Sequence, residues 1–446
     1  MANQKDEVQQ FVVDDLANVQ HYLEIPSVST ENRGIPEVVA WLSSTFKDLG
    51  ANRIEQWNEL GGNPVIFAEF SVGKAKTLLF YNHYDVQPEA PLDLWHTKPF
   101  EPTIKDGKLF ARGASDDKGE LMSRLSIVKY YQQHGGLPCN LKFVVEGEEE
   151  IGSPHIDDYV AKHANDLKAD ACIWEGGTKN ERDRFQVTCG MKGIFTFDMK
   201  VTTADKDIHS SQACYIDNAA WRLVKALNSL LDDQGNIDVD GFYDDVVPLD
   251  NPTKDAIDKM DFDAERIKKH YGLKRPFITK NPKRALVQGS TLTINGLSSG
   301  FEGQGNKTIL PHNARAKLDC RLFAGQKPHH IFDLIRKQLD HNGYSDVEMS
   351  YAAGEEAFLT PLTDPFVRLC QQTAKTVYGD DNYLLVPDMP GGGPGRAFQK
   401  ALNLPIVLVG IHYSGSDPHS PNENIRLEDY RQGSYYLYQL LKSFGK

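Results

Sequence analysis

A cluster of carboxylates follows a short apolar segment in the first third of the chain. Residues 141–145 have the composition of a buried strand, and they lead into Glu146, Gly147 and three consecutive glutamates at 148–150. Adjacent carboxylates repel one another and raise each other's pKa, which makes such a cluster costly. A bound cation removes that cost. The segment therefore predicts either a solvated acidic turn or part of a metal site.

Four other segments hold similar side chains where a strand ends or a helix begins. His83 and Asp85 lie two residues apart after a predicted strand and would face the same side of it. A metal-bound histidine needs such a carboxylate to orient its ring. Each of the others also has a simpler interpretation, such as N-capping or a surface loop. They are the pair Asp116 and Asp117, the strand-end residue Glu175, and the loop residue His419.

Taken together, these segments give two histidines and several carboxylates in one α/β region. Ligands on such a sheet bind outside the carboxyl ends of the strands. A mixed set of His, Asp and Glu without cysteine suits zinc, manganese or cobalt. One shared carboxylate with two further ligands on each side would form a two-metal centre.

The elements that must position these residues alternate between strand and helix. Helical periodicity is seen at 6–23, 36–49 and 119–133, and strand patterns at 64–70, 77–81, 141–145 and 171–174. Beyond residue 190 the strands alternate in polarity, as half-exposed antiparallel strands do. Those strands are expected at 194–201, 290–294, 316–323 and 347–351, with helices at 218–231 and 328–339. An α/β pattern returns at 364–378, 405–410 and 427–441.

This alternation predicts one α/β domain, residues 1–190 and 363–446, interrupted by an inserted domain at 191–362. The inserted domain would have a four-stranded antiparallel sheet and two helices. The segment 235–283 within it is rich in Asp, Lys and Pro and is predicted to be a long loop or helical excursion, with no assigned role.

Composition narrows the class of protein. The 446 residues carry a net charge of −13, which argues against nucleic acid or an anionic membrane as the main partner. The N-terminal segment is polar, and no apolar run approaches the roughly 20 residues that span a bilayer. The six cysteines are scattered, as in reduced proteins. We therefore expect a cytoplasmic protein without a signal peptide.

The order of the motifs resembles a known family. His83-x-Asp85, Asp116-Asp117-Lys-Gly119, a Glu-Gly-x-Glu-Glu-x-Gly pattern at 146–152, and His419-Ser-x-Asn-Glu423 follow one another along the chain. They resemble the clan MH zinc metallopeptidases, which include carnosine dipeptidase, carboxypeptidase G, aminoacylase and related deacylases. The segments 83–88 and 207–210 are most similar to the dipeptidase branch. The resemblance implies a mixed-sheet catalytic domain with an inserted α+β lid, through which two subunits dimerise.

The resemblance also implies a role for each matching residue. The glutamate pair of the motif is here taken as Glu148 and Glu149. Glu148 would be the general base, Asp85 would orient His83, and a cis peptide would join Asp116 to Asp117. The implied ligands of two zinc ions are His83 and Glu175 for one, Glu149 and His419 for the other, and Asp116 bridging both.

The inserted domain would supply a second group of residues. His209 would act in trans, stabilising the oxyanion in the partner subunit's site of a homodimer. Arg321 would bind the terminal carboxylate of the substrate. Further substrate contacts are expected at Asn306, Thr308, Gly392 and Gly393.

The implied function is a di-zinc dipeptidase acting on small peptides with a free C-terminal carboxylate. An N-acyl-amino-acid amidohydrolase using the same centre is the alternative, and a catalytically silent relative is a third. The first two differ in whether the pocket offers an acid to the α-amino group of the substrate. The silent relative would have lost ligands or the base, and all of them are present in the sequence.

Overall fold

A ten-stranded mixed sheet lies at the centre of the computed structural model, which describes residues 2–446. The strands follow the order β1-β2-β6-β3-β7-β19-β9-β8-β20, and β18 pairs with β9. Their bounds are β1 Arg53–Trp57, β2 Val65–Phe70, β3 Thr77–His83, β6 Asn140–Glu146, β7 Ala171–Trp174, β8 Thr178–Lys179, β9 Phe185–Thr188, β18 Tyr383–Val386, β19 Ile406–Leu408 and β20 His412–Tyr413. The central strands β6, β3, β7 and β19 are parallel, so their carboxyl ends meet at one edge of the sheet.

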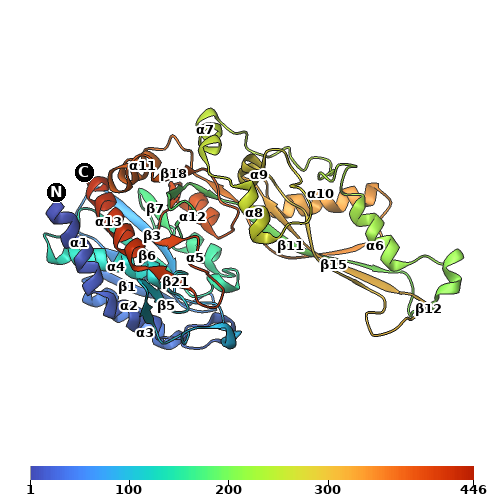
Figure 1. Cartoon of the computed structure of the whole chain (residues 1–446), viewed down its shortest axis with the longest axis horizontal. Helices are drawn as coiled ribbons and strands as arrows, with labels where there is room; N and C mark the ends of the chain where they lie inside the picture. The colour runs from blue at the N-terminus through green and yellow to red at the C-terminus, as the bar shows by residue number, and fades with distance from the viewer. Residues whose placement is uncertain (1) are drawn as a thin grey trace.

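Helices cover both faces of this sheet (Figure 1). Alternate residues of β3 pack on opposite sides, Leu78 and Phe80 in one apolar cluster and Leu79 and Tyr81 in another. The larger cluster includes residues of α1 Ala2–Asp14, α2 Leu16–Leu23, α3 Ile35–Asp48, α4 Lys118–Gln133, α11 Pro365–Tyr378 and α13 Leu427–Phe444. The other includes residues of α5 Ile156–Lys162 and α12 Gly395–Leu402.

The inserted region has its own sheet and core. Four antiparallel strands follow the order β13-β15-β11-β16, and residues of two helices share an apolar cluster with them. These elements are β11 Gly193–Thr202, β13 Thr293–Ser299, β15 Asn313–Leu322, β16 Glu348–Glu355, α6 Ala219–Asn228 and α10 Pro328–His341. Figure 1 shows this region extending away from the large sheet, and we call it the lid.

Short pairings complete the fold. The pair β12 Ile208–His209 and β14 Ile309–Leu310 lies at the end of the lid farthest from the large sheet (Figure 1). The pair β10 Gly190–Met191 and β17 Phe358–Leu359 lies where the chain enters and leaves the lid. A small sheet joins β4 Thr103–Lys105, β5 Lys108–Phe110 and β21 Asn424–Arg426, and so ties the last part of the chain to the first third.

The predicted excursion at 235–283 contains helices and packs against the large sheet. It includes α7 Asn251–Lys259 and α8 Ala264–Tyr271, and α9 Pro282–Gln288 follows at its end. Ile257, Met260 and Val287 share an apolar cluster with Leu384 and Val386 of β18. The excursion therefore bridges the lid and the large sheet.

The expected α/β fold with an antiparallel inserted sheet is confirmed, with one local difference at the N-terminus. The helix expected at 6–23 is divided into α1 and α2 at Asp15. The Asp15 carboxylate accepts hydrogen bonds from Asn18 (2.7 Å), the Ser126 hydroxyl (2.7 Å) and Lys129 of α4 (2.5 Å). A side chain that bonds to neighbouring groups in this way favours a helix end over a helix interior.

Candidate metal centre

Three strand ends, a helix start and a loop bring the predicted ligands together. His83 ends β3, Glu175 follows β7, and Asp116 precedes α4. Glu150 lies in the 3₁₀ turn that follows β6, and His419 lies in the loop between β20 and β21. Because the strands are parallel, these side chains converge at the edge where a ligand is expected on such a sheet.

The two histidines contact opposite oxygens of one carboxylate. His83 Nε2 lies 3.0 Å from Asp116 Oδ1, and His419 Nε2 lies 2.9 Å from Asp116 Oδ2. On the first side, Glu175 Oε2 lies 3.4 Å from His83 Nε2, and on the second, Glu150 Oε2 lies 3.1 Å from His419 Nε2. This is the arrangement of a carboxylate that bridges two cations, each with one histidine and one glutamate.

In the absence of cations, His419 and Glu175 of this cluster have raised pKa values. Hydrogen bonds to Asp116 and Glu150 raise the pKa of His419 to about 10. Burial, with neighbouring carboxylates, raises the pKa of Glu175 well above its usual value, and its Oε2 has no hydrogen-bond partner within residues 2–446. A buried acid without a donor is costly unless a cation neutralises it. The donors therefore fit a dinuclear metal site.

Asp85 and Asp117 accept hydrogen bonds from the ligand residues and so fix their positions. The Asp85 carboxylate accepts the backbone N–H groups of Glu149 (3.3 Å) and Glu150 (3.1 Å) and lies 3.4 Å from His83 Nδ1. The His83 ring donates to the Asp85 carbonyl at 2.9 Å. Asp117 Oδ2 accepts the backbone N–H of His83 at 3.1 Å, and the Asp116–Asp117 peptide is cis, as expected. Such contacts fix the orientation of a metal-binding histidine.

The structure corrects the assignment of the consecutive glutamates by one residue. Glu150, not Glu149, lies beside His419, and Glu149 lines the cavity that contains the cluster. Glu148 accepts a hydrogen bond from the His155 ring at 2.6 Å and lies below Gly62, whose added Cβ would meet it at 2.4 Å. It does not line the cavity among the described residues. Glu148 therefore lacks the geometry of a general base.

A signal for the correct register was present in the motif. The pattern Glu-Gly-x-Glu-Glu-x-Gly leaves one unspecified residue between Gly147 and the glutamate pair. With Glu148 in that unspecified place, the pair falls on Glu149 and Glu150. The unspecified residue is itself a glutamate here, so residue type alone could not tell which two glutamates form the pair. The spacing from Gly147 and Gly152 could.

Glu423 was quoted in the last motif without a role, and it joins the two loops that hold the bridging carboxylate and His419. Its buried carboxylate accepts five hydrogen bonds from the 112–116 segment. They come from Arg112 Nη1 (2.7 Å), the backbone N–H groups of Gly113 (2.9 Å), Ser115 (2.8 Å) and Asp116 (2.9 Å), and the Ser115 hydroxyl (2.9 Å). The position of Asp116 therefore depends on a residue near the end of the chain.

Replacing Glu423 should weaken metal binding and stability together. Glu423→Gln removes the charge that faces the buried Arg112 guanidinium. Leaving one partner of a buried pair alone costs about 3–5 kcal/mol, and losing a contact behind a ligand lowers metal affinity about 10–100-fold. Competitive chelator titration and denaturant unfolding would measure the two effects. Glu428→Gln, at an exposed acid of α13, is the control, and equal metal affinity in both variants would contradict the role of Glu423.

The predicted lid residues do not lie at the metal cluster of their own chain. His209 and Thr308 belong to the β12–β14 end of the lid, where His209 pairs with Ile309 and the Thr308 carbonyl accepts the Ser210 N–H at 3.1 Å. Asn306 is exposed in the loop before β14. Asn306 and Thr308 therefore lie at the β12–β14 end of the lid, away from the metal cluster of their own chain, because the lid extends away from the large sheet (Figure 1).

Arg321 and the glycine-rich segment lie near the base of the lid. Arg321 is the penultimate residue of β15 and donates to the Pro390 carbonyl at 3.4 Å. Gly392 lines the same cavity as the metal cluster, and a Cβ added there would approach Arg321 Nη1 at 3.6 Å. A Cβ on Gly393 would meet the Met191 side chain at 3.1 Å. Both glycines therefore allow a close approach of the backbone on this side of the cavity.

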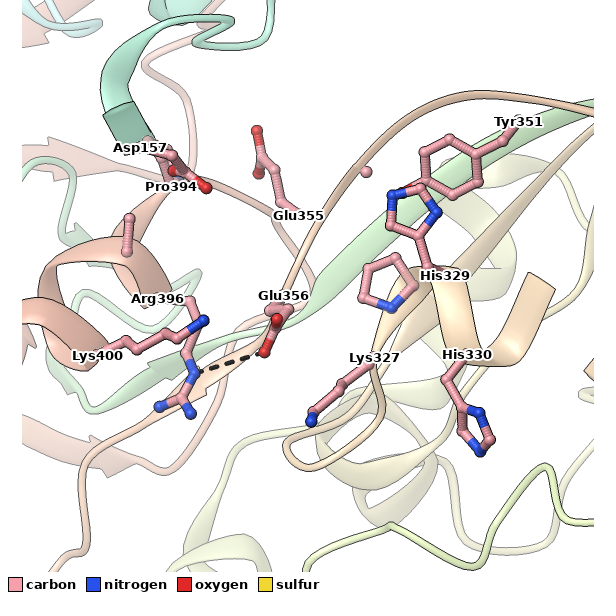
Figure 2. Close-up of a pocket in the computed structure, with 13 residues that line it drawn as sticks. Asp157, Lys327, His329, His330, Tyr351, Glu355, Glu356, Pro394, Arg396 and Lys400 are labelled. Atoms are coloured by element: carbon pink, nitrogen blue, oxygen red, sulfur yellow. Dashed lines mark ion pairs between the residues drawn. The ribbon is translucent and has the colours of Figure 1, made fainter. Parts of the chain in front are cut away.

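A second cavity of about 430 Å³ lies between the lid and helices α5 and α12 (Figure 2). Asp157, Arg396 and Lys400 line it from one side, and His329 and Tyr351 line it from the lid. Glu355 lies between them. Burial, with a contribution from Asp157, raises the pKa of Glu355 to about 7, although Arg321 acts in the opposite direction.

The raised pKa of Glu355 should make stability depend on pH. Between its ordinary pKa near 4.5 and about 7, the folded chain holds a proton that the unfolded chain releases. The free energy of unfolding should therefore fall by about 1–2 kcal/mol as the pH rises through this window. Glu355→Gln should remove this fall, whereas the neighbouring Glu356→Gln should keep it. Denaturant unfolding at several pH values would measure the difference, and identical pH profiles for wild type and Glu355→Gln would contradict it.

Two findings concern the chain as a whole. No helix within residues 2–446 is long and apolar enough to cross a membrane. All six cysteines lie in the described part of the chain, and none of them forms a disulfide there.

Several relatives match most of the length of the chain. It is 28% identical to a Beta-Ala-His dipeptidase of Rattus norvegicus, over 87% of this chain and 81% of the relative. It is 28% identical to a Cys-Gly metallodipeptidase of Candida albicans, over 97% of this chain and 94% of the relative. The solved structure of an M20 family metallo-carboxypeptidase from Sulfolobus solfataricus is 36% identical, with a TM-score of 0.88, and covers 97% of this chain and 99% of that one.

A family model also matches most of the chain. The model described as peptidase family M20/M25/M40 covers residues 79–443, a range that begins within β3 and ends within α13. It thus includes all five residues of the metal cluster and the whole lid. The chain belongs to the peptidase family M20/M25/M40.

Proposed function

We propose that this protein is a di-zinc dipeptidase that hydrolyses dipeptides or short peptides with a free C-terminal carboxylate. The observation behind it is the Asp116 carboxylate, whose two oxygens face His83 and His419 separately. The names of two relatives, a Beta-Ala-His dipeptidase and a Cys-Gly metallodipeptidase, support dipeptides as substrates. Manganese or cobalt would suit the same oxygen and nitrogen donors.

The residues divide into ligands and a base. His83 and Glu175 would hold one cation, Glu150 and His419 the other, and Asp116 both. Two bound cations would activate a water molecule and polarise the scissile carbonyl. Glu149 would take the proton from that water at its carboxylate and deliver it to the leaving nitrogen. In the absence of cations, burial and the nearby Asp116 and Glu150 raise the pKa of Glu149, and His83 acts in the opposite direction.

The lid, residues 191–362, would complete the site across a homodimer. His209 is exposed at the far end of the lid and cannot serve the cluster of its own chain in this arrangement (Figure 1). We assign it to the oxyanion in the partner subunit's site, with Asn306 and Thr308 beside it. Arg321, Gly392 and Gly393 would contact the substrate within the same chain, the Arg321 guanidinium binding the terminal carboxylate. The six unpaired cysteines favour the cytoplasm.

A turnover assay with defined metal content tests the proposal. Protein loaded with two zinc ions per chain should release free amino acids from a panel of unblocked dipeptides. A chelator should abolish the activity, and added zinc, manganese or cobalt should restore it. A fully loaded protein that cleaves neither unblocked nor N-acylated dipeptides would contradict the proposal. Cleavage of the N-acylated compounds alone would indicate the amidohydrolase alternative.

A further inference from the structure

The cavity that contains the metal cluster continues beyond it into a mainly apolar chamber. The cavity has a volume of about 560 Å³. Its apolar walls come from the catalytic sheet and its connections and from the excursion of the lid, with Met191, Met260, Leu286, Val386 and Leu408 among them. Met260 belongs to the excursion at 235–283, to which the sequence alone assigned no role, and Leu286 lies on α9 at its end. The excursion therefore forms one wall of the chamber.

Besides Glu149 and the metal cluster, the described lining contains one further acid. Asp388 follows β18 and is only 2% exposed. Neither of its carboxylate oxygens has a hydrogen-bond partner within residues 2–446. Burial raises its pKa well above the usual value, and Lys192 and the adjacent backbone N–H of Met389 act in the opposite direction. A buried carboxylate without a donor is costly, and such groups are retained where a ligand supplies the missing partner.

Lys192 is the nearest candidate for a partner within the chain, but it is bound elsewhere. Its ammonium group donates to the carbonyl of Gly289, the residue that follows α9. Lys192 therefore attaches the excursion to the entrance of the lid. Asp388 lines the cavity, and its two buried oxygens accept no well-formed hydrogen bond within residues 2–446. This is the arrangement of a subsite for a cationic group.

We propose that Asp388 binds an ammonium group on the substrate residue that precedes the scissile bond. This inference rests on the proposed peptidase function and names its substrate class: peptides with a positive charge on that residue, from the free α-amino group or from a basic side chain. A carboxylate here repels the C-terminal carboxylate of the substrate, which would instead face Arg321. Asp388 would thus set the direction in which the peptide lies across the metal cluster.

The test compares three substrates on the zinc-loaded enzyme. Ala-Leu has a free α-ammonium group, N-acetyl-Ala-Leu has none, and N-acetyl-Lys-Leu has a side-chain ammonium group only. A site built around an ionic contact should favour its cationic ligand by about 100-fold in kcat/KM. If Ala-Leu alone is favoured, Asp388 binds the α-ammonium group, and if N-acetyl-Lys-Leu is favoured, it binds the side chain. Equal rates on all three substrates would overturn the inference while leaving the peptidase function intact.

The variant Asp388→Asn keeps the shape and removes the charge. We expect it to lose about 10–100-fold in kcat/KM on the favoured substrate, mainly through a higher KM, and to change less than about threefold on N-acetyl-Ala-Leu. Asp388→Glu should recover part of the selectivity. Glu356→Gln is the control at an acid of the second cavity, and it should keep the wild-type ratios. A uniform loss on all three substrates would indicate a structural role and overturn the inference.

A remaining explanation is that Asp388 only neutralises the charge of Lys192. The variant Lys192→Met distinguishes this explanation from substrate binding. If Asp388 binds substrate, this variant should keep the preference for the ammonium-bearing peptide. If the preference disappears to the same extent as in Asp388→Asn, the lysine and not the substrate is the partner of Asp388. Metal content and melting temperature, measured for every variant, confirm that the comparison is made on folded, loaded enzyme.

Discussion

Glu149→Gln should lower turnover by about 10²–10⁴-fold, because general-base catalysis contributes a factor of that size. The amide cannot accept the proton from water, but it keeps the size of the side chain. Glu149 contacts neither histidine as closely as Glu150 and Glu175 do, so both metals should remain bound. Steady-state kinetics with metal analysis on the same sample would measure this.

The neighbouring glutamates provide matched controls for this prediction. Glu148→Gln should keep most of the activity, because Glu148 bonds to His155 outside the cavity. Glu150→Gln should instead lose affinity for one of the two metals, because its carboxylate lies beside His419. If Glu148→Gln were the inactive variant and Glu149→Gln kept the wild-type rate, the register taken from the structure would be wrong.

His209→Ala should lower kcat by about 10²–10³-fold, as the loss of one oxyanion donor does in other hydrolases. Its metal content should not change, since His209 lies at the opposite end of the lid from the large sheet (Figure 1). The variant should also leave the fold unchanged, because the ring is exposed and bonds only to nearby Ser211 (2.9 Å to its hydroxyl) among the described residues.

Mixing two inactive variants tests whether the histidine acts in trans. In a dimer of one His209→Ala chain and one Glu149→Gln chain, one site has both an intact base and an intact histidine. Random exchange of subunits in equal amounts should therefore restore about a quarter of wild-type activity. Native mass spectrometry would confirm the exchange. Mixed dimers without activity would show that His209 does not serve the partner's site.

The positions of most helices and strands could be predicted from the local pattern of apolar and polar residues. The strand segments expected at 77–81 and 141–145 are the cores of β3 and β6, and the helices expected at 119–133 and 364–378 agree with α4 and α11 within one residue. These segments combine a clear periodicity with turn residues at their ends, so the local sequence determines them. Three of the metal-cluster residues, His83, Glu150 and Glu175, could be expected to lie together because they end or follow strands of the same parallel sheet.

Other features depend on contacts that sequence does not reveal. Consecutive glutamates are chemically identical, and only the turn after β6 decides which one faces His419. Asp388 is a single acid in a loop, and its lack of a partner is visible only once its neighbours are placed. The excursion has a surface-like composition, yet Met260 and Leu286 reach the cavity because α7 and α9 pack near β18.

The link between Glu423 and the 112–116 segment has a consequence for how the protein is made. The bond from the Asp116 N–H to Glu423 spans 307 residues of chain, and the whole lid lies between them. A nascent chain on the ribosome therefore has no complete site for two cations until almost all of it has been synthesised. A chain that stops before His419 lacks one histidine of the metal cluster and also the Glu423 contacts that position Asp116.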